Sequence, residues 1–486
     1  MNILKQDSLN IKTTKNQTTG IVISYIILGA SFITTLVTLI NAFEAPQGYQ
    51  IMWLLPLLYG ILFSCTRVRK AIFRYTGITI LNFVLAARYL LIPLYSSLTG
   101  VYFHSYASST YGDANSGAIL IMVYEMICIF CVLHITIGLL NRQESIYDNG
   151  PLYYDNHYFI YIIVILGGVV SLFIFPSVLE RMNVLLVKNF VFNNLDTFAS
   201  IGYMLTVNVQ KMLLLIIILR EYKKITKGRK VSFLLISGVA LLNIAVFWST
   251  NRLTVVAQSI ATILLIKTVI PSKGKLFYTL LGTISILVIF SLSSYRWFGE
   301  GELFGFLNAS TSRFDAQEIT NYLQAYLGGP HLISTAIEAH DRYSSVIGVE
   351  SFFNEMLGSI MFVRQLPFIG EISTATIFNY YFGFTEENSM ILPTLGQSYM
   401  YFGTIGAPIL SVIFCLLIYY VEKALIECRS IGEKYAYYIL VIWLAFFPMQ
   451  NLNIVMSTIF NVFLPLYLIV VTNNKITLRK KKRKVK

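Results

Sequence analysis

Long apolar runs alternate with short polar connections along most of the chain. Each run reaches about 20 residues, the length of helix that crosses the roughly 30 Å hydrocarbon core of a bilayer. Because backbone amides must be hydrogen-bonded inside hydrocarbon, each run predicts a transmembrane α-helix. The pattern predicts about twelve spans, at residues 21–42, 51–66, 72–95, 117–140, 158–177, 200–220, 231–249, 253–270, 276–293, 400–421, 434–453 and 457–473.

One long polar segment, residues 294–395, interrupts the series of spans and is called the 294–395 loop below. Functional groups of a protein concentrate on loops that a rigid scaffold positions. The sequence therefore predicts a membrane domain of about nine spans over residues 1–293, the loop over 294–395, and the last three spans with a basic tail over 396–486.

The basic residues orient this arrangement, because short cytoplasmic loops collect Lys and Arg. With the N-terminus inside, the basic clusters at 5–15, 67–70, 223–230, 273–275 and 475–486 all fall on the cytoplasmic side. Both termini are then cytoplasmic, and the 294–395 loop faces outward. We expect an all-α polytopic integral membrane protein with one large helical extracytoplasmic loop.

The composition agrees with a membrane setting. Hydrophobic residues make up 56% and charged residues 13% of the 486 positions, whereas a soluble domain carries about 25% charge. The net charge of +13 does not require nucleic acid, because a basic tail directly after a span is typical of an anchor that attracts anionic lipid. The Cys128–Cys131 pair lies mid-span without two further ligands, so we expect packing sulfur and no metal or cofactor there.

Three ionisable residues fall inside predicted spans: Arg88, Glu125 and Lys211. A charge in hydrocarbon costs at least a few kcal/mol and is kept mainly where it faces a cavity or a partner. The three are candidate substrate-binding residues of one internal cavity. The alternative is a structural Arg88–Glu125 pair, with Lys211 extending its ammonium to the membrane surface.

Arginines at the outer ends of spans form the second candidate group. Arg252 follows an abrupt polar S-T-N, and Arg296 follows Tyr295 at the mouth of the ninth span, with Arg313 further along. Guanidinium groups grip phosphate bidentately and stay charged, so the three arginines are candidate catalytic residues that bind a polyanion, with Tyr295 at the substrate. Binding of lipid headgroups is the alternative for each arginine.

The 294–395 loop itself has the pattern of several short helices. Ser312 and Asp315 have the S-x-x-D spacing of a capping box, Gly328-Gly329 predicts a helix end, and Pro330 suits the first turn of the next helix. An apolar stripe over 352–363, opposite Glu350, Asn354 and Glu355, predicts a helix lying in the membrane interface.

The loop also carries the candidate proton acceptors. An imidazole accepts a proton from a hydroxyl near neutral pH, so His331 and His340 are candidate catalytic bases, with Asp315 and Arg342 as substrate-binding neighbours. His331 ranks slightly ahead, because its position at a helix start favours the neutral ring. A loop carboxylate is the alternative base, and a merely structural histidine is the alternative for each ring.

Several of these motifs resemble one family. The runs YLGGPHLIS and NSMILPTLGQSYMYFGTIGAPIL, the intramembrane RYLLIP, and the arginines in STNR and SSYR are similar to the Wzy-type polymerases of O-antigen and capsule pathways. The late large loop among about twelve spans fits as well. An arginine separated from a glycine by ten residues, found in some members, is not matched, because Arg313 precedes Gly328 and Gly329 by more than that.

The resemblance implies a metal-independent membrane glycosyltransferase, GT-C-like and related to O-antigen ligases, in the bacterial cytoplasmic membrane. Such enzymes move a growing glycan from undecaprenyl pyrophosphate onto a sugar hydroxyl of the next lipid-linked unit. Paired arginines at span mouths match Arg252 and Arg296. Chain-length regulator and flippase proteins are the implied partners. The rival interpretations are a lipid-linked oligosaccharide flippase or other transporter, an O-antigen-ligase-like transferase, and a structural subunit of an export complex.

The orientation is directly testable. Cysteines placed at Ser310 and Glu386 should react with a membrane-impermeant maleimide in intact cells, because the basic clusters put the 294–395 loop outside. A cysteine at Lys227 should react only after the cells are opened. Protection of both loop positions in intact cells would overturn the orientation.

Overall fold

The protein is almost wholly helical where its structure is described. The computed structural model describes residues 3–105, 109–146, 152–153, 157–184, 195–248, 252–270, 280–287, 315–361, 363, 373–383 and 390–485. The only strands within these residues are the two-residue β1 (Asn183–Val184) and β2 (Val246–Phe247), which pair antiparallel. The all-α part of the expected fold class is therefore confirmed for the described residues.

Two compact units divide the chain. The first unit contains residues 1–148, 312–426 and 443–456, and the second contains 149–311, 427–442 and 457–486. The described helices of the 294–395 loop thus belong to the same unit as the N-terminal helices, although the sequence suggested a separate segment.

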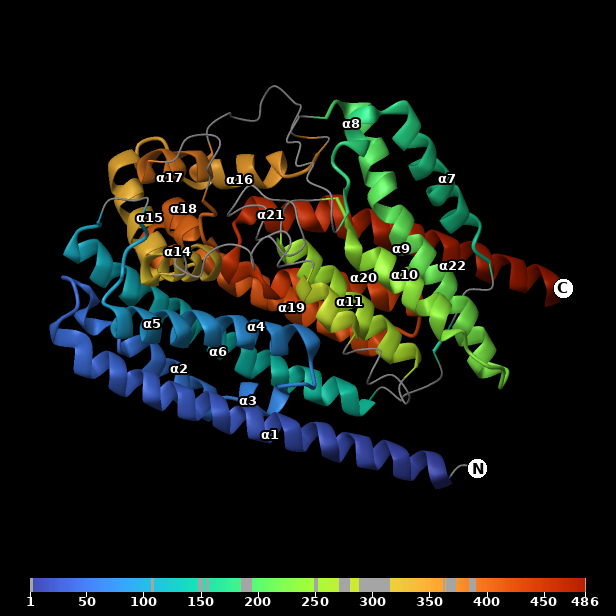
Figure 1. Cartoon of the computed structure of the whole chain (residues 1–486), viewed down its shortest axis with the longest axis horizontal. Helices are drawn as coiled ribbons and strands as arrows, with labels where there is room; N and C mark the ends of the chain where they lie inside the picture. Colours follow the sequence, from blue (N-terminus) through green and yellow to red (C-terminus); the bar gives the residue numbers. More distant parts are fainter. Residues whose placement is uncertain are drawn as a thin grey trace. The chain divides into compact units, whose positions relative to one another are not determined.

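The first unit combines long helices with a group of shorter ones (Figure 1). They are α1 (Ile3–Ile40), α2 (Leu54–Cys65), α3 (Val68–Ala71), α4 (Thr76–Ala86), α5 (Ile92–Thr99), α6 (Gly112–Ile146), α14 (Ala316–Leu327), α15 (Pro330–Tyr343), α16 (Val349–Gly358), α17 (Thr374–Phe382), α18 (Thr394–Gly406), α19 (Ile409–Glu427) and α21 (Leu452–Ser457). Contacts run from α1 to α2, from α2 to α6, from α6 to α15, and from α15 to α18.

The second unit is built around one long helix. Its helices are α7 (Phe159–Ile174), α8 (Pro176–Leu179), α9 (Thr197–Thr226), α10 (Phe233–Ala245), α11 (Arg252–Val269), α20 (Ile431–Ala445) and α22 (Leu464–Val485). Helix α9 packs against α7 and α10, and α22 packs against α7. Val178, Ala199 and Trp248 form a small core beside the β1–β2 pair.

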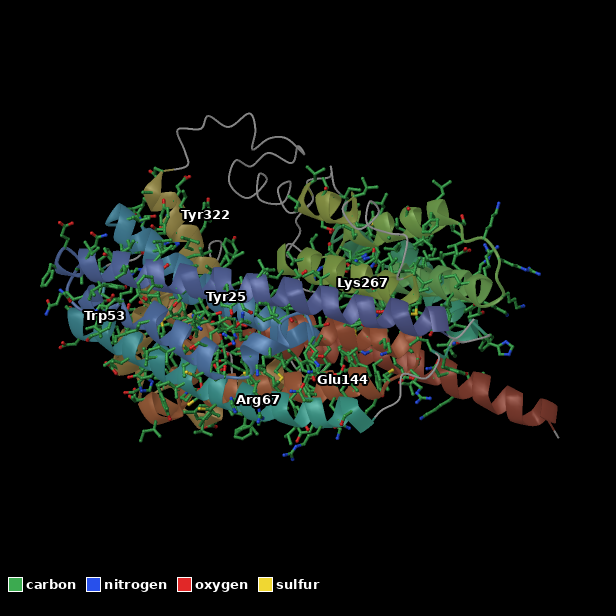
Figure 2. All side chains as sticks on the ribbon, turned by 90° about the horizontal axis from the view of Figure 1, so that it is seen from below. Tyr25, Trp53, Arg67, Glu144, Lys267 and Tyr322 are labelled. Atoms are coloured by element: carbon green, nitrogen blue, oxygen red, sulfur yellow. The ribbon has the colours of Figure 1, made fainter. Side chains whose placement is uncertain are left out.

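Six helical stretches of the described residues are long and apolar enough to cross a membrane: Thr19–Phe43, Thr76–Thr99, Gly112–Ser145, Thr197–Thr226, Ile409–Glu427 and Leu452–Ile476. Four shorter apolar helices coincide with further expected spans, at Tyr49–Cys65, Phe159–Ile174, Phe233–Ala245 and Leu253–Val269. Side chains such as Tyr25, which is 65% exposed on α1 (Figure 2), suit contact with lipid. The number of twelve spans stays a prediction, and most of the expected span 276–293 lies outside the described residues.

Two expected span boundaries are wrong, and prolines lie at both places. The expected span 400–421 is divided between two helices: α18 ends at Gly406, and α19 begins at Ile409, directly after Pro408. The expected span 434–453 is broken after Ala445 by a 3₁₀ turn at Phe447–Met449 that contains Pro448. Proline lacks the amide that an α-helix interior needs, so the helices restart beyond these sites.

Local chemistry sets the turn between α14 and α15. Asp315 caps α14, since its Oδ1 accepts a hydrogen bond from the Glu318 amide at 2.7 Å. The predicted capping box begins at Ser312, which lies outside the described residues, and Asp315 itself is the N-cap of α14. Gly328, with φ of +63°, ends α14, and Pro330 starts α15. Both of these expectations are confirmed. The expected interface helix is shorter than its apolar stripe, since α16 ends at Gly358.

An apolar core holds the loop helices together. Leu332 and Ala336 of α15 pack with Phe378 and Phe382 of α17 and with Met400 of α18, all of them buried. Burial of each large side chain contributes about 1.5–3 kcal/mol, so α15 is a fixed element rather than a loose surface helix.

Replacing Gly328 should test how tightly this turn is held. Gly328→Ala should lower the free energy of unfolding by about 2 kcal/mol or more, because alanine disfavours positive φ and its Cβ would lie 2.7 Å from the Pro448 carbonyl oxygen. Gly383 is the matched control, since its φ is +84° but a Cβ added there would have no atom within 4 Å among the described residues. Thermal unfolding in detergent compares the two variants. Equal destabilisation would show that the contact with Pro448 is unimportant.

Candidate functional site

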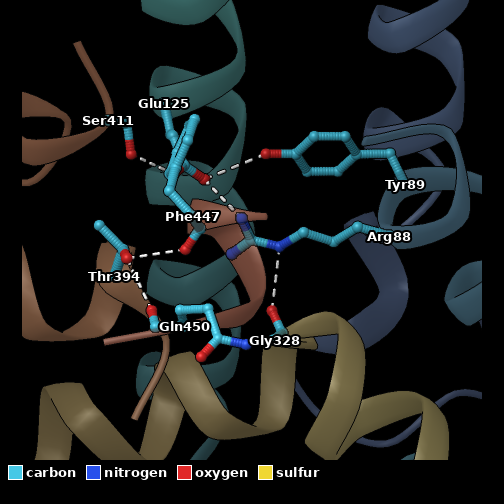
Figure 3. A network of polar contacts seen from close by, with 8 residues as sticks. All are labelled: Arg88, Tyr89, Glu125, Gly328, Thr394, Ser411, Phe447 and Gln450. Carbon is cyan, nitrogen blue, oxygen red and sulfur yellow. Dashed lines mark hydrogen bonds and ion pairs between the residues drawn. The ribbon is translucent and has the colours of Figure 1, made fainter. Parts of the chain in front are cut away.

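A buried ion pair lies in a network of polar contacts within the first unit (Figure 3). Arg88 Nη1 lies 2.9 Å from Glu125 Oε2, and both side chains are 0% exposed. Tyr89 donates a hydrogen bond to Oε2 at 3.1 Å, and Ser411 donates to Oε1 at 2.5 Å. Both oxygens of the carboxylate therefore have protein partners, as a buried charge requires.

The same arginine connects the membrane-length helices to the loop helices. Arg88 lies in a π-helical segment, Ala87–Leu91, between α4 and α5. Its Nε donates to the carbonyl oxygen of Gly328 at 3.0 Å, at the end of α14. The structural pair between Arg88 and Glu125 that the sequence left as an alternative is thus confirmed, and Arg88 positions the α14–α15 turn.

Helix α15 carries both candidate histidines in different surroundings. His331 is 0% exposed, and its Nδ1 accepts a hydrogen bond from the His104 amide at 2.8 Å. Its ring packs edge-on against Phe103 and near Phe382. A ring nitrogen that already accepts a backbone hydrogen bond does not take a proton from a substrate. The geometry therefore argues against ranking His331 ahead of His340.

His340 is half-buried further along the same helix. Its Nδ1 lies 3.1 Å from the Met400 carbonyl oxygen, which has only acceptor capacity, so Nδ1 carries the proton. Nε2 is then the acceptor, and no hydrogen bond to it is recorded from the described residues. The ring rests edge-on against Tyr399 at 5.2 Å between centroids. This is the arrangement of an oriented proton acceptor.

The acidic and basic neighbours of His340 have separate surroundings. Glu338 accepts hydrogen bonds from the Tyr111 amide at 2.6 Å and from the Tyr381 hydroxyl at 2.8 Å. Burial and this carboxylate raise the pKa of Tyr381 to about 12. Arg342 is exposed, with its guanidinium carbon 6.0 Å from the Tyr343 ring centroid. Arg342 is thus accessible to a ligand, whereas Glu338 is engaged.

Sequence reasoning missed a buried carboxylate in the loop helices. Glu355 of α16 is 5% exposed, and its Oε1 accepts from the Thr374 amide at 2.6 Å and the Thr374 hydroxyl at 2.7 Å. Its Oε2 accepts from Gln397 Nε2 at 2.9 Å. No ion pair to Glu355 is recorded among the described residues. Its sequence neighbours look like an ordinary polar helix face, so periodicity gave no signal.

The Glu355 network fixes α18, the helix that supplies the Met400 carbonyl. Gln397 also accepts a hydrogen bond from the Leu452 amide at 2.6 Å and donates to the Tyr401 hydroxyl at 2.8 Å. Burial and the nearby Glu355 carboxylate raise the pKa of Tyr401 well above its usual range. Thr394, one turn earlier, donates to the carbonyl oxygens of Phe447 and Gln450. The motif PTLGQSYMY therefore contains the residues that hold α18 in place.

The second unit holds the third intramembrane charge. Lys211 is 3% exposed, and its Nζ donates to the Val207 carbonyl at 2.7 Å. The alternative in which this side chain extends to the membrane surface is therefore wrong. The neighbouring Asn208 Oδ1 is buried with no hydrogen-bond partner among the described residues. Lys211 lies in the second unit, whereas Arg88 and Glu125 lie in the first.

The remaining candidates have little or no described geometry. Arg252 is the first residue of α11, consistent with its expected place at a span end, but its side chain lies outside the described residues. Tyr295, Arg296 and Arg313 lie wholly outside them. Asp315 uses one carboxylate oxygen to cap α14 and is otherwise exposed. Within the described part of the chain, no three His, Cys, Asp or Glu side chains converge as metal ligands.

Comparison of the chain with protein-family models, with curated proteins and with solved structures finds no match.

The Arg88–Glu125 pair should prove essential to folding. Glu125→Ala should cost about 3–5 kcal/mol of unfolding free energy, because it leaves a buried guanidinium without its counter-charge. Arg74→Ala is the matched control, since Arg74 pairs with Glu144 at 2.7 Å but both side chains are nearly half exposed; its loss should cost about 0–1 kcal/mol. The double variant Arg88→Met/Glu125→Leu should recover most of the loss. Equal effects of Glu125→Ala and Arg74→Ala on the unfolding midpoint would contradict the central role of the pair.

Proposed function

We propose that the protein is a membrane glycosyltransferase that polymerises lipid-linked oligosaccharide repeat units. It transfers a growing glycan from undecaprenyl pyrophosphate to a sugar hydroxyl of the next lipid-linked unit, on the outer face of the bacterial cytoplasmic membrane. The observation that carries the proposal is His340, whose Nδ1 faces the Met400 carbonyl while Nε2 has no recorded partner among the described residues.

The transfer needs a proton acceptor and a site for a leaving pyrophosphate. The acceptor hydroxyl gives its proton to His340 Nε2 as its oxygen forms the new bond to the donor sugar C1. The C1–oxygen bond to the pyrophosphate breaks, and the electron pair stays on the leaving group. Arg252, Arg296 and Arg313 are the proposed cations that neutralise this charge, because guanidinium binds phosphate bidentately.

The contacts around α15 and α18 support an oriented base. The apolar core fixes α15, and the Gln397–Glu355 hydrogen bond fixes α18 one turn before Met400. Arg88 fixes the start of α15 through Gly328. The helices that carry His340 and its partner Met400 are therefore fixed by three separate sets of contacts. Accurate placement of a base is worth more to the reaction rate than its mere presence.

A lipid-linked oligosaccharide flippase is the second candidate, and Lys211 is the observation that favours it. A buried ammonium whose recorded partner among the described residues is a backbone carbonyl is typical of an ion or substrate pathway through the membrane. The loop histidine has no role in that alternative. For the polymerase, the proposed partners are a flippase that delivers the substrate and a chain-length regulator, and neither nucleic acid nor a cofactor is required.

The function is tested with the purified full-length protein in nanodiscs and lipid-linked repeat units. His340→Ala should lower the rate of polymer formation at least a hundredfold, because general base catalysis contributes roughly 10²–10⁴-fold, while the amount of folded protein stays unchanged. Arg296→Ala should also abolish long glycan, and Arg296→Lys should restore only part of it because the fork geometry is lost.

Two controls separate the alternatives. Asp341→Asn, at an exposed neighbour of His340, should leave the rate within about twofold of the wild type. His331→Phe should reduce the yield of folded protein rather than the rate per folded molecule.

Cells lacking the gene should accumulate single repeat units on the outer face if the chain is a polymerase, and lipid-linked units on the inner face if it is a flippase. Wild-type amounts of polymer from His340→Ala would show that His340 is not the general base.

A further inference from the structure

An open cavity of about 470 Å³ lies beside the basic segment 67–70 of the first unit, away from the loop helices that hold His340. Its lining includes Arg67, just after α2, and His134 and Arg142 of α6. Arg67 and Arg142 are exposed, and Arg67 is labelled in Figure 2. We propose that this cavity binds the phosphate headgroup of an anionic phospholipid.

The position along α6 places the cavity at the membrane surface. The apolar run of this helix ends at Leu140 and is followed by Asn141 and Arg142. On the neighbouring helix, α2 ends at Cys65, two residues before Arg67. The lining residues of α6, from 134 to 142, therefore straddle the boundary between apolar and polar sequence. A phospholipid headgroup lies at this boundary.

Two kinds of side chain line the cavity. Ile135 and Leu139 are apolar and 61% and 42% exposed, which is unfavourable in water but favourable against an acyl chain. The guanidinium groups supply the charge for a phosphate. A soluble phosphate would use only the second feature, whereas a phospholipid uses both. This combination selects a lipid as the occupant.

The backbone of α6 makes room for one guanidinium. Arg67 Nη1 donates to the His134 carbonyl oxygen at 3.4 Å, and a Cβ added at Gly138 would lie 1.9 Å from Nη1. A side chain at position 138 would therefore displace the flexible end of Arg67. The nearby Glu144 does not neutralise the site, because it already pairs with Arg74 and accepts from Tyr75 at 3.1 Å. The two lining arginines therefore keep their charge for a ligand.

The proposal is tested with the purified full-length protein in detergent. Short-chain phosphatidylglycerol is titrated against it, with phosphatidylcholine of the same chain length and inorganic phosphate as comparison ligands, and binding is followed by native mass spectrometry and by the shift in unfolding temperature. The wild type should bind phosphatidylglycerol at least tenfold more tightly than phosphatidylcholine, since each basic side chain near a headgroup contributes about 1 kcal/mol. Inorganic phosphate should bind weakly.

Variants locate the binding at the cavity. Arg67→Gln/Arg142→Gln should reduce the preference for phosphatidylglycerol about tenfold or more, and Gly138→Ala should reduce it by displacing Arg67. Lys70→Gln is the matched control, because Lys70 is an exposed cation of the same basic segment, in α3, and does not line the cavity; the preference of this variant for phosphatidylglycerol should stay at the wild-type level. An equal loss in Lys70→Gln would indicate general surface charge, and equally tight binding of inorganic phosphate would indicate a soluble anion. Either result overturns the proposal.

Discussion

The rest of the first unit depends on the buried pair between Arg88 and Glu125. Taking two charges out of water costs several kcal/mol per ion, and only close geometry with further hydrogen bonds repays that cost. Tyr89, Ser411 and the Gly328 carbonyl supply those bonds. Because the partners come from α6, α19 and the end of α14, satisfying one ion pair requires all of these segments to be in place together.

The position of α15 follows from that requirement. Gly328 ends α14 with a backbone conformation that few residues other than glycine adopt, and its carbonyl is held by Arg88, so the start of α15 has little freedom. From there the helix packs between α6 and α18. His331 lies on the buried side of α15, whereas His340 is half-buried near the C-terminal end of the helix. Two histidines of one helix therefore differ in what they can do, and the packing reverses the order in which the sequence ranked them.

Features that depend on local chemistry could be predicted from the sequence. The helix end at Gly328 and the helix start at Pro330 rest on the conformations of single residues. The Arg88–Glu125 pair could be predicted as an alternative, because a charged side chain in hydrocarbon is costly unless it has a partner or faces a cavity. Features that depend on distant segments could not be predicted. Glu355 is buried only because Thr374 and Gln397, 19 and 42 residues away, come to it.

Exposure, rather than residue type, separates the roles of the arginines in the first unit. Arg88 is 0% exposed, and its Nη1 and Nε donate to protein atoms that hold helices together. Arg67 and Arg142 have the same guanidinium but lie open beside an apolar wall. An arginine that is already paired in a dry interior has no charge left for a ligand, whereas one at the membrane surface gains by taking a phosphate. In a chain with many cations, the environment of each guanidinium therefore decides whether it stabilises the fold or binds.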